Sequence, residues 1–173
     1  MTATPELLAA SGLLVSGGLL AAAGVAKVVR PDGTARALQQ AGLPGRPVVV
    51  RVGAALEVAV GTVAVALGGP VPALLVAASY LGFAAFVATA IRRGWSLSSC
   101  GCFGEPDVPP TRLHVVADLA VAAVAAAAAA GDVHPATVIA QHPAQGVLLC
   151  AMSALIAGMV YLLLSRLPRL QVS

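Results

Sequence analysis

Charged and aromatic residues are both scarce in this sequence. Charged side chains make up 10% of its 173 residues and aromatic ones 3%, whereas hydrophobic residues make up 59%. The mean hydropathy of +0.93 reflects more apolar surface than a globule of this length can bury, which argues against a soluble protein. No basic face with interleaved aromatics is present, so nucleic acid is not an expected partner. The composition predicts an integral membrane protein in contact with the lipid bilayer.

The hydrophobic residues gather in long runs rather than in alternation. Each run approaches the roughly 20 residues that a helix needs to cross a bilayer, and is too long for a barrel strand. Turn-forming stretches such as "RPDG" (Arg30–Gly33) and "GLPGRP" (Gly42–Pro47) separate the runs. We therefore predict one all-α membrane domain over residues 1–173, a bundle of about five transmembrane helices at about 7–29, 48–67, 71–91, 113–131 and 146–165.

Two of these runs have special features. The first has no basic residue before it, so we expect a retained span rather than a cleaved leader. The fourth contains "AAVAAAAAA" (Ala122–Ala130), which is only mildly apolar. Because small side chains let helices approach closely, we expect this span to pack inside the bundle.

The basic residues predict an orientation in the membrane. With five spans, all ten fall at or near loops on one side, and the positive-inside rule places that side in the cytoplasm. In this plasma-membrane protein the N-terminus would then lie outside the cell, while the C-terminus and the loop after the third span would lie in the cytoplasm. The ten are Lys27, Arg30, Arg36, Arg46, Arg51, Arg92, Arg93, Arg112, Arg166 and Arg169.

The loop after the third span, "SSCGCFGEPDVPP", holds two of the three cysteines. A Cys-Gly-Cys spacing separates the α-carbons by roughly 5.5 to 7 Å, at the upper edge of disulfide geometry. A Cys100–Cys102 bridge would be strained, even with Gly101 free to adopt a tight turn. A strained bridge is readily reduced, which favours exchange with another dithiol over a structural role.

Other interpretations of these thiols remain open. Cys100 and Cys102 are inert loop thiols in one and metal ligands in another, although a closed zinc site needs four ligands. Nearby arginines favour the reactive thiolate, whereas Glu105 and Asp107 oppose it. We predict no metal site. The third cysteine, Cys150, is expected to be a small buried hydrophobe in the last span.

An acidic residue interrupts the second span. Gly53, Glu57 and Gly61 are spaced four residues apart and therefore share one helix face. On that face a carboxyl group lies between two glycines, at which another helix can approach closely. A carboxylate in lipid usually faces a partner or a cavity. Lys27 is the candidate partner; the alternative is that Lys27 extends to the headgroups.

A second polar pair begins the fourth span. His114 and Asp118 are four residues apart and share a helix face just after the cysteine loop. Asp118 in that position can orient the imidazole, and His114 can exchange protons with a thiol. A purely structural role for both residues is the alternative.

Several of these stretches resemble the methylamine utilisation protein MauE family, related to the DoxX-like membrane proteins. The similar stretches are "CGCFG", which includes Phe103 and Gly104, "LLAAAGVAKVVRPDG", with Gly24 and Lys27, and "LEVAVG", with Glu57. The resemblance covers about 7–131, a four-helix core, and leaves the last helix as an addition. It implies a redox-associated membrane protein that assists maturation or disulfide chemistry of exported proteins beside a thioredoxin-like partner.

Three functional hypotheses follow. In the first, Cys100 and Cys102 form a reversible dithiol, with a lipid-soluble quinone as a candidate electron acceptor, although no quinone pocket is visible in the sequence. In the second, the protein is a non-catalytic membrane scaffold for a redox or maturation complex. In the third, it is a small-solute transporter with Glu57 at its centre, which the lack of an inverted repeat disfavours.

Overall fold

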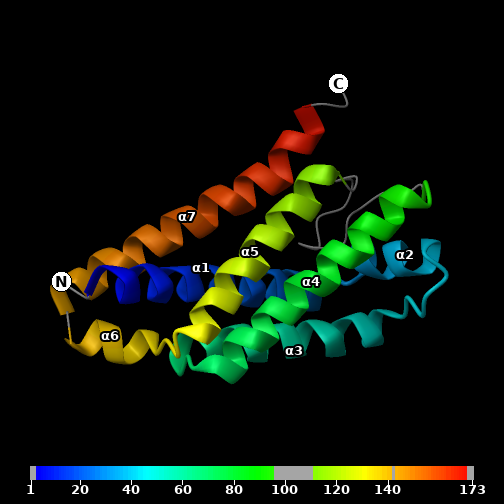
Figure 1. The fold of residues 1–173 in the computed structure, drawn as a ribbon. Coiled ribbons are helices and arrows are strands. Elements are labelled where there is room, and N and C mark those ends of the chain that lie inside the picture. Colours follow the sequence, from blue (N-terminus) through cyan, green and yellow to red (C-terminus); the bar gives the residue numbers. More distant parts are fainter. Residues whose placement is uncertain (1–2, 96–110, 142, 171–173) are drawn as a thin grey trace.

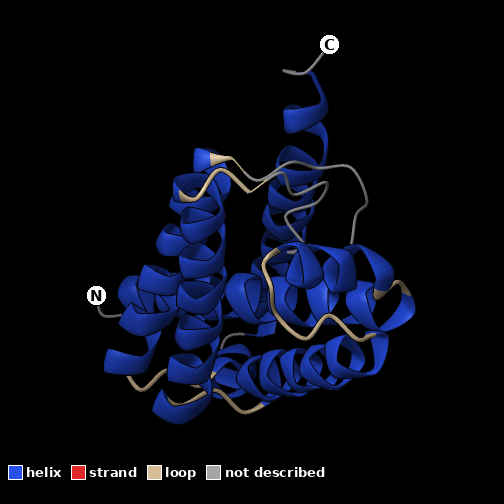
Figure 2. Cartoon of the chain, turned by 90° about the vertical axis from the view of Figure 1, so that its right-hand side faces the viewer, coloured by secondary structure: helices blue, strands red, loops and turns tan. Residues whose placement is uncertain are grey.

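The described part of the chain is built from helices. A computed structural model describes residues 3–95, 111–141 and 143–170, and this part of the chain contains no strand (Figures 1 and 2). Its helices are α1 (Ala3–Val29), α2 (Asp32–Gln40), α3 (Pro47–Ala66), α4 (Pro70–Arg92), α5 (Arg112–Ala130), α6 (Pro135–Gln141) and α7 (Pro143–Leu170).

The long helices confirm the predicted class of protein. Within the described residues, four segments are long and apolar enough to cross a membrane: Glu6–Val29, Pro47–Ala66, Pro70–Arg92 and Arg112–Ala130. The chain is therefore an all-α membrane protein. The apolar part of α7 in the described residues runs from Gln145 to Met159 and is shorter, so a fifth span remains a prediction.

The spans pack as two close pairs, α1 with α3 and α4 with α5. Helix α1 lies along α3, and α4 lies along α5; α1 also contacts α4, α5, α6 and α7 (Figure 1). Tyr80 of α4 donates a hydrogen bond from its hydroxyl to the main-chain oxygen of Ser16 on α1 (3.1 Å), which ties the two pairs together. The core between them is built from Leu13, Leu20, Val76, Ala122 and Ala125.

Two glycines let α1 and α3 approach closely. A Cβ on Gly24 would lie 2.7 Å from the main-chain oxygen of Ala54, and one on Gly61 would lie 2.7 Å from the main-chain nitrogen of Ala21. The predicted close approach is thus confirmed at Gly61. It is wrong at Gly53, where a Cβ would meet no atom within 4 Å, because the space beside that residue belongs to a cavity rather than to a helix.

The alanine-rich helix α5 packs through its small side chains, as predicted. Ala122, Ala125 and Ala128 are all buried, and α4 lies along this helix. The expectation for Cys150 is wrong: its side chain is exposed. Helix α7 contacts α1 and α6, so part of its circumference, including Cys150, faces away from the bundle.

Two short helices were not predicted. Helix α2 begins within the "RPDG" stretch that we expected to be only a turn. It buries Ala35 and Ala37 and exposes Arg36 and Gln39, so it is amphipathic and stays at the end of the bundle instead of crossing it (Figure 1). Helix α6 follows the turn at Gly131–His134. A search for runs of bilayer length misses helices of this size.

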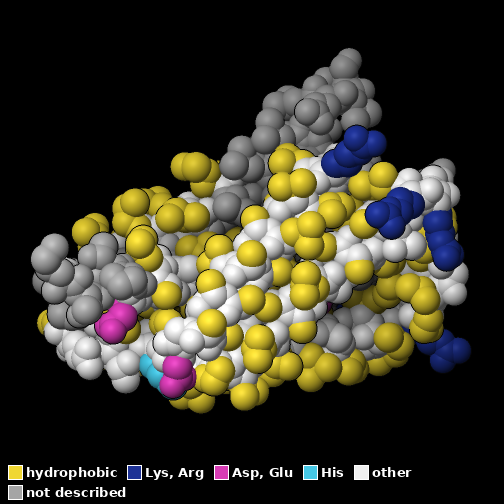
Figure 3. Space-filling view, viewed as in Figure 1, with side chains coloured by type: hydrophobic (Ala, Val, Ile, Leu, Met, Phe, Trp, Pro, Cys, Tyr) yellow, Lys and Arg dark blue, Asp and Glu magenta, His cyan; other side chains and the backbone are white. Residues whose placement is uncertain are grey.

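The two ends of the bundle differ in charge. Most of the described basic residues lie where α1 and α4 end, on α2, and where α3 and α5 begin, and Figure 3 shows Lys and Arg gathered at one end. The same view shows acidic residues and histidine at the opposite end. There His134 Nδ1 lies 2.8 Å from the main-chain oxygen of Leu67, and the Gly69 N–H donates to the Val133 carbonyl at 2.8 Å. The side of the membrane that each end faces remains a prediction.

Candidate functional site: a buried ion pair beside a cavity

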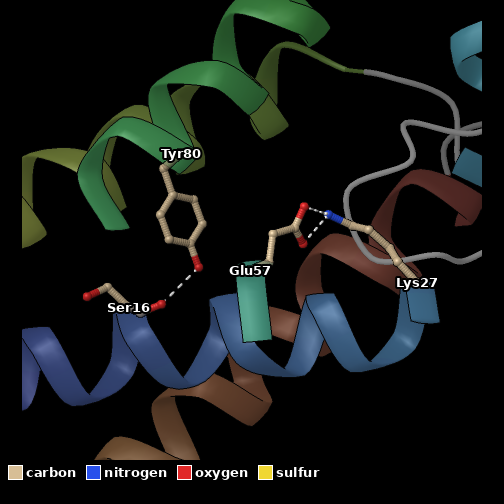
Figure 4. A network of polar contacts seen from close by, with 4 residues as sticks. All are labelled: Ser16, Lys27, Glu57 and Tyr80. Atoms are coloured by element: carbon tan, nitrogen blue, oxygen red, sulfur yellow. Dashed lines mark hydrogen bonds and ion pairs between the residues drawn. The ribbon is translucent and has the colours of Figure 1, made fainter. Parts of the chain in front are cut away.

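The ionisable residues of the first two spans meet in the bundle. Lys27 Nζ on α1 donates hydrogen bonds to both carboxylate oxygens of Glu57 on α3, at 2.8 and 2.6 Å (Figure 4). The Lys27 residue is 3% exposed, and the Glu57 side chain is 17% exposed. The predicted pairing is therefore confirmed, and the alternative in which Lys27 reaches the headgroups does not describe the structure.

An aromatic ring completes the surroundings of the lysine. The Lys27 ammonium lies 4.4 Å from the centre of the Phe83 ring on α4, within the range of a cation–π contact. Phe83 in turn packs edge-on against Tyr80, with ring centres 5.8 Å apart. Three helices thus fix the position of one ammonium group, which limits the geometries open to Glu57.

A cavity of about 350 Å³ lies beside this pair. Helices α1, α2, α3 and α4 all contribute to its wall, which is apolar except for the ion pair and one hydroxyl group. Gly53 is part of the wall, which explains the open space at its Cα. The lining residues are Lys27, Thr34, Ala37, Leu38, Val49, Val50, Gly53, Ala54, Glu57, Phe83 and Phe86.

The cavity wall touches the start of the cysteine loop. Phe86 lines the cavity and packs against Trp95, with ring centres 6.4 Å apart. Trp95 is the last described residue before that loop, and Arg93 lies over its ring at 5.6 Å. A chain of two aromatic side chains therefore connects the cavity to the segment that carries the cysteines. The pair Cys100 and Cys102, with Gly101, Phe103 and Gly104, lies outside the described residues.

The other end of the cysteine loop leads into the second polar pair. Thr111 caps α5, and its hydroxyl oxygen lies 2.8 Å from Nδ1 of His114. The Thr111 main-chain N–H also donates to this nitrogen at 3.3 Å, so the imidazole takes part in a capping box. His114 is 1% exposed and Asp118, one turn further, is 4% exposed. Both predicted residues are thus inside the bundle on one face of α5.

Sequence reasoning missed the aromatic part of the site. Of the six aromatic residues in the chain, Tyr80, Phe83, Phe86 and Trp95 fall within sixteen consecutive positions. In a chain so poor in aromatics, that concentration was the available signal. No group of acidic, histidine or cysteine side chains that can hold a metal ion occurs among residues 3–95, 111–141 and 143–170.

These features define a helical membrane protein with a buried ion pair beside a cavity. The family model for the methylamine utilisation protein MauE matches residues 4–131, well over half of the chain. The chain belongs to this family, as the resemblance implied. No curated protein and no solved structure gives a significant match to the chain.

Proposed function

We propose that the protein is a membrane thiol–disulfide exchange protein in which Cys100 and Cys102 are the reacting pair. The observation that carries the proposal is the position of His114 and Asp118. Both are buried in the first two turns of α5, the helix that begins directly after the cysteine loop. A buried imidazole beside such a loop is a suitable proton acceptor for a thiol.

The exchange proceeds in two displacements. A thiolate from the Cys-Gly-Cys pair attacks a disulfide sulfur of the partner, which forms a mixed disulfide and releases one partner thiolate. The second thiolate of the pair then attacks the mixed disulfide, which closes the Cys100–Cys102 bridge and frees the second partner thiolate. His114 accepts a proton from an attacking thiol and returns it to a leaving thiolate. The two displacements together reduce the partner by two electrons. The reverse sequence oxidises the partner.

The charges at the ends of the loop support this chemistry. Arg92, Arg93 and Arg112 all lie within a few residues of the described ends of α4 and α5. Cations near a thiol favour the reactive thiolate. We propose a thioredoxin-fold protein as the partner, because such proteins present an accessible dithiol or disulfide to an incoming sulfur.

Trapping the mixed disulfide tests the proposal. In cells acidified to stop exchange, Cys100→Ser or Cys102→Ser removes one thiol of the pair and is expected to accumulate a covalent adduct, visible by non-reducing electrophoresis. The double variant is expected to lose both adduct and function. Cys150→Ser is the matched control, because Cys150 is exposed on α7, a helix that contacts α1 and α6, and it should change neither.

The same variants distinguish exchange chemistry from the scaffold hypothesis. Full function in the Cys100→Ser/Cys102→Ser double variant would refute exchange chemistry and support a scaffold role. An adduct that requires Cys150 would place the reacting thiol on α7 instead.

A further inference from the structure

We propose that the cavity beside Lys27 and Glu57 binds the ring of a lipid-soluble quinone. This inference rests on the proposed function and adds the electron acceptor or donor with which the cysteine pair reacts. The cavity volume of about 350 Å³ falls at the small end of ligand-binding pockets, which run from roughly 300 to 1,000 Å³. That size suits the ring of a small molecule.

The position of the cavity favours a ligand that arrives from the bilayer. Val49 and Gly53 both line the cavity and are exposed at the surface. They belong to the first two turns of α3, one of the four segments that can cross the membrane. The mouth of the cavity therefore opens sideways near the end of a span, where an apolar tail can remain in lipid while a ring enters the protein.

The charges in the cavity select a neutral ligand. Lys27 and Glu57 cancel each other's charge, so a free anion or cation would have to break their two hydrogen bonds. An ammonium group carries three hydrogens, and within the described part of the chain two of them go to Glu57. The third can be donated to a carbonyl oxygen, while a carboxylate oxygen of Glu57 can accept a hydrogen bond from a hydroxyl group.

This combination of groups matches both forms of a quinone. The oxidised form presents carbonyl oxygens to Lys27, and the reduced form presents hydroxyl groups to Glu57. Phe83 and Phe86 supply aromatic surface for the flat ring. A lipid acyl chain fits the apolar wall but has no polar atom for the ion pair, and a phosphate headgroup would have to break the hydrogen bonds between Lys27 and Glu57.

The electrons and protons lost by the cysteine pair equal those gained by the quinone. The thiols of Cys100 and Cys102 lose two electrons and two protons as one sulfur–sulfur bond forms. The quinone gains the same two electrons and two protons and becomes a quinol with two new O–H bonds. Lys27 stabilises negative charge on the ring oxygen before its proton arrives. The aromatic contact from Phe86 to Trp95 links the cavity wall to the loop that carries the thiols.

Tryptophan fluorescence offers a direct measurement of binding. Trp95 is the one tryptophan in the chain and touches the cavity wall through Phe86. In lipid nanodiscs that contain the full chain, a short-chain benzoquinone should quench this fluorescence with a saturable component. Gly53→Leu should remove that component, because the added side chain enters the cavity. Glu57→Gln should weaken binding of the corresponding quinol, measured by its competition with the quinone, about tenfold, because a quinol hydroxyl loses its carboxylate acceptor.

A matched glycine controls for general effects on the bundle. A Cβ added at Gly82 on α4 would also meet no atom within 4 Å, but Gly82 does not line the cavity. The Gly82→Leu variant should therefore bind the quinone with the same affinity as the natural protein. Equal saturable quenching in Gly53→Leu and Gly82→Leu would overturn the assignment of the site. Equal competition by a saturated fatty alcohol, with no effect of Glu57→Gln, would show an acyl-chain site and overturn the quinone.

The cysteine variants separate this inference from the proposed function. Cys100→Ser/Cys102→Ser should bind the quinone normally but fail to convert it to quinol when the prereduced protein is mixed with it without oxygen. Normal adduct trapping without saturable quinone binding would refute the quinone site alone. Saturable binding in the cavity with no cysteine-dependent quinol formation would confirm the site and refute electron exchange with the thiols.

Discussion

Lys27 and Glu57 come from different spans, thirty positions apart, and meet in a two-pronged ion pair with N–O distances of 2.8 and 2.6 Å. Removing two charges from water is costly, and the attraction between them compensates only while both remain. The lysine is almost fully buried and also lies against Phe83. The pair therefore behaves as one unit, in which the loss of either partner leaves an uncompensated charge.

This coupling predicts a non-additive effect of mutations. Glu57→Leu should lower the free energy of unfolding by about 3–5 kcal/mol, as measured for broken buried pairs, because Lys27 is left charged in the bundle. The double variant Lys27→Met/Glu57→Leu should recover most of that loss, because both charges are gone. Unfolding in mixed detergent micelles measures the stabilities of the natural protein, of Lys27→Met and Glu57→Leu alone, and of the double variant. Losses that simply add in the double variant would contradict the coupling.

The close contact between α1 and α3 at their glycines predicts how glycine-to-alanine substitutions change the stability of the protein. Gly24→Ala should lower the free energy of unfolding by about 1–3 kcal/mol through overpacking, since its methyl group would lie 2.8 Å from Val58 Cγ2. Gly61→Ala should do the same against Ala21. Gly18→Ala and Gly53→Ala are the controls, because a methyl group at either position meets no atom within 4 Å. A control variant that is less stable to heat than Gly24→Ala would refute this packing account.

The sequence was sufficient to predict the spans and the Lys27–Glu57 pair for a simple physical reason. An acid in the middle of an apolar run needs a partner, and Lys27 was the basic residue at a matching depth in the neighbouring span. Periodicity also placed Gly53 and Gly61 on one face correctly. Periodicity does not show how far along this face of α3 the contact with α1 extends. The tight contact at Gly61 was therefore predicted, and the open space at Gly53 was not.

The cavity and the short helices lay beyond sequence reasoning. Four helices contribute to the cavity wall, and its existence depends on how their axes diverge, which no local pattern encodes. Helix α2 is amphipathic but has only nine residues, too few to stand out in a search for runs of bilayer length. Cys150 was misassigned because an apolar sequence does not distinguish a side that faces lipid from one that faces protein.

The charge difference between the two ends predicts which cysteines a reagent outside the cell can reach. A membrane-impermeant maleimide should fail to label Cys100 and Cys102 in intact cells after mild reduction, because the basic end is expected in the cytoplasm. Asp132→Cys, in a variant whose three cysteines are serine, is the control. The Asp132 side chain is 71% exposed at the opposite end and should be labelled readily. Labelling of the natural pair but not of Asp132→Cys would reverse the orientation.

The imidazole of His114 has a structural role and a proposed chemical one, and two substitutions separate them. Glutamine is a capping-box residue at this helix position, so His114→Gln should keep the bond to the Thr111 main-chain N–H while it removes the titrating ring. His114→Ala removes both. If the imidazole exchanges protons with a thiol, His114→Gln should keep the stability of the natural protein and slow disulfide exchange by about 10²-fold or more.

The pH profile of exchange makes this test specific. With the imidazole gone, the rate should rise with pH as free thiolate replaces the missing proton acceptor, so the difference from the natural protein narrows in alkaline buffer. The measurement is exchange with a model disulfide across a pH series, beside the thermal stability of each variant. A His114→Gln protein with the natural rate and profile, next to an unstable His114→Ala protein, would leave His114 as a helix cap and remove the proton-transfer step from the proposed function.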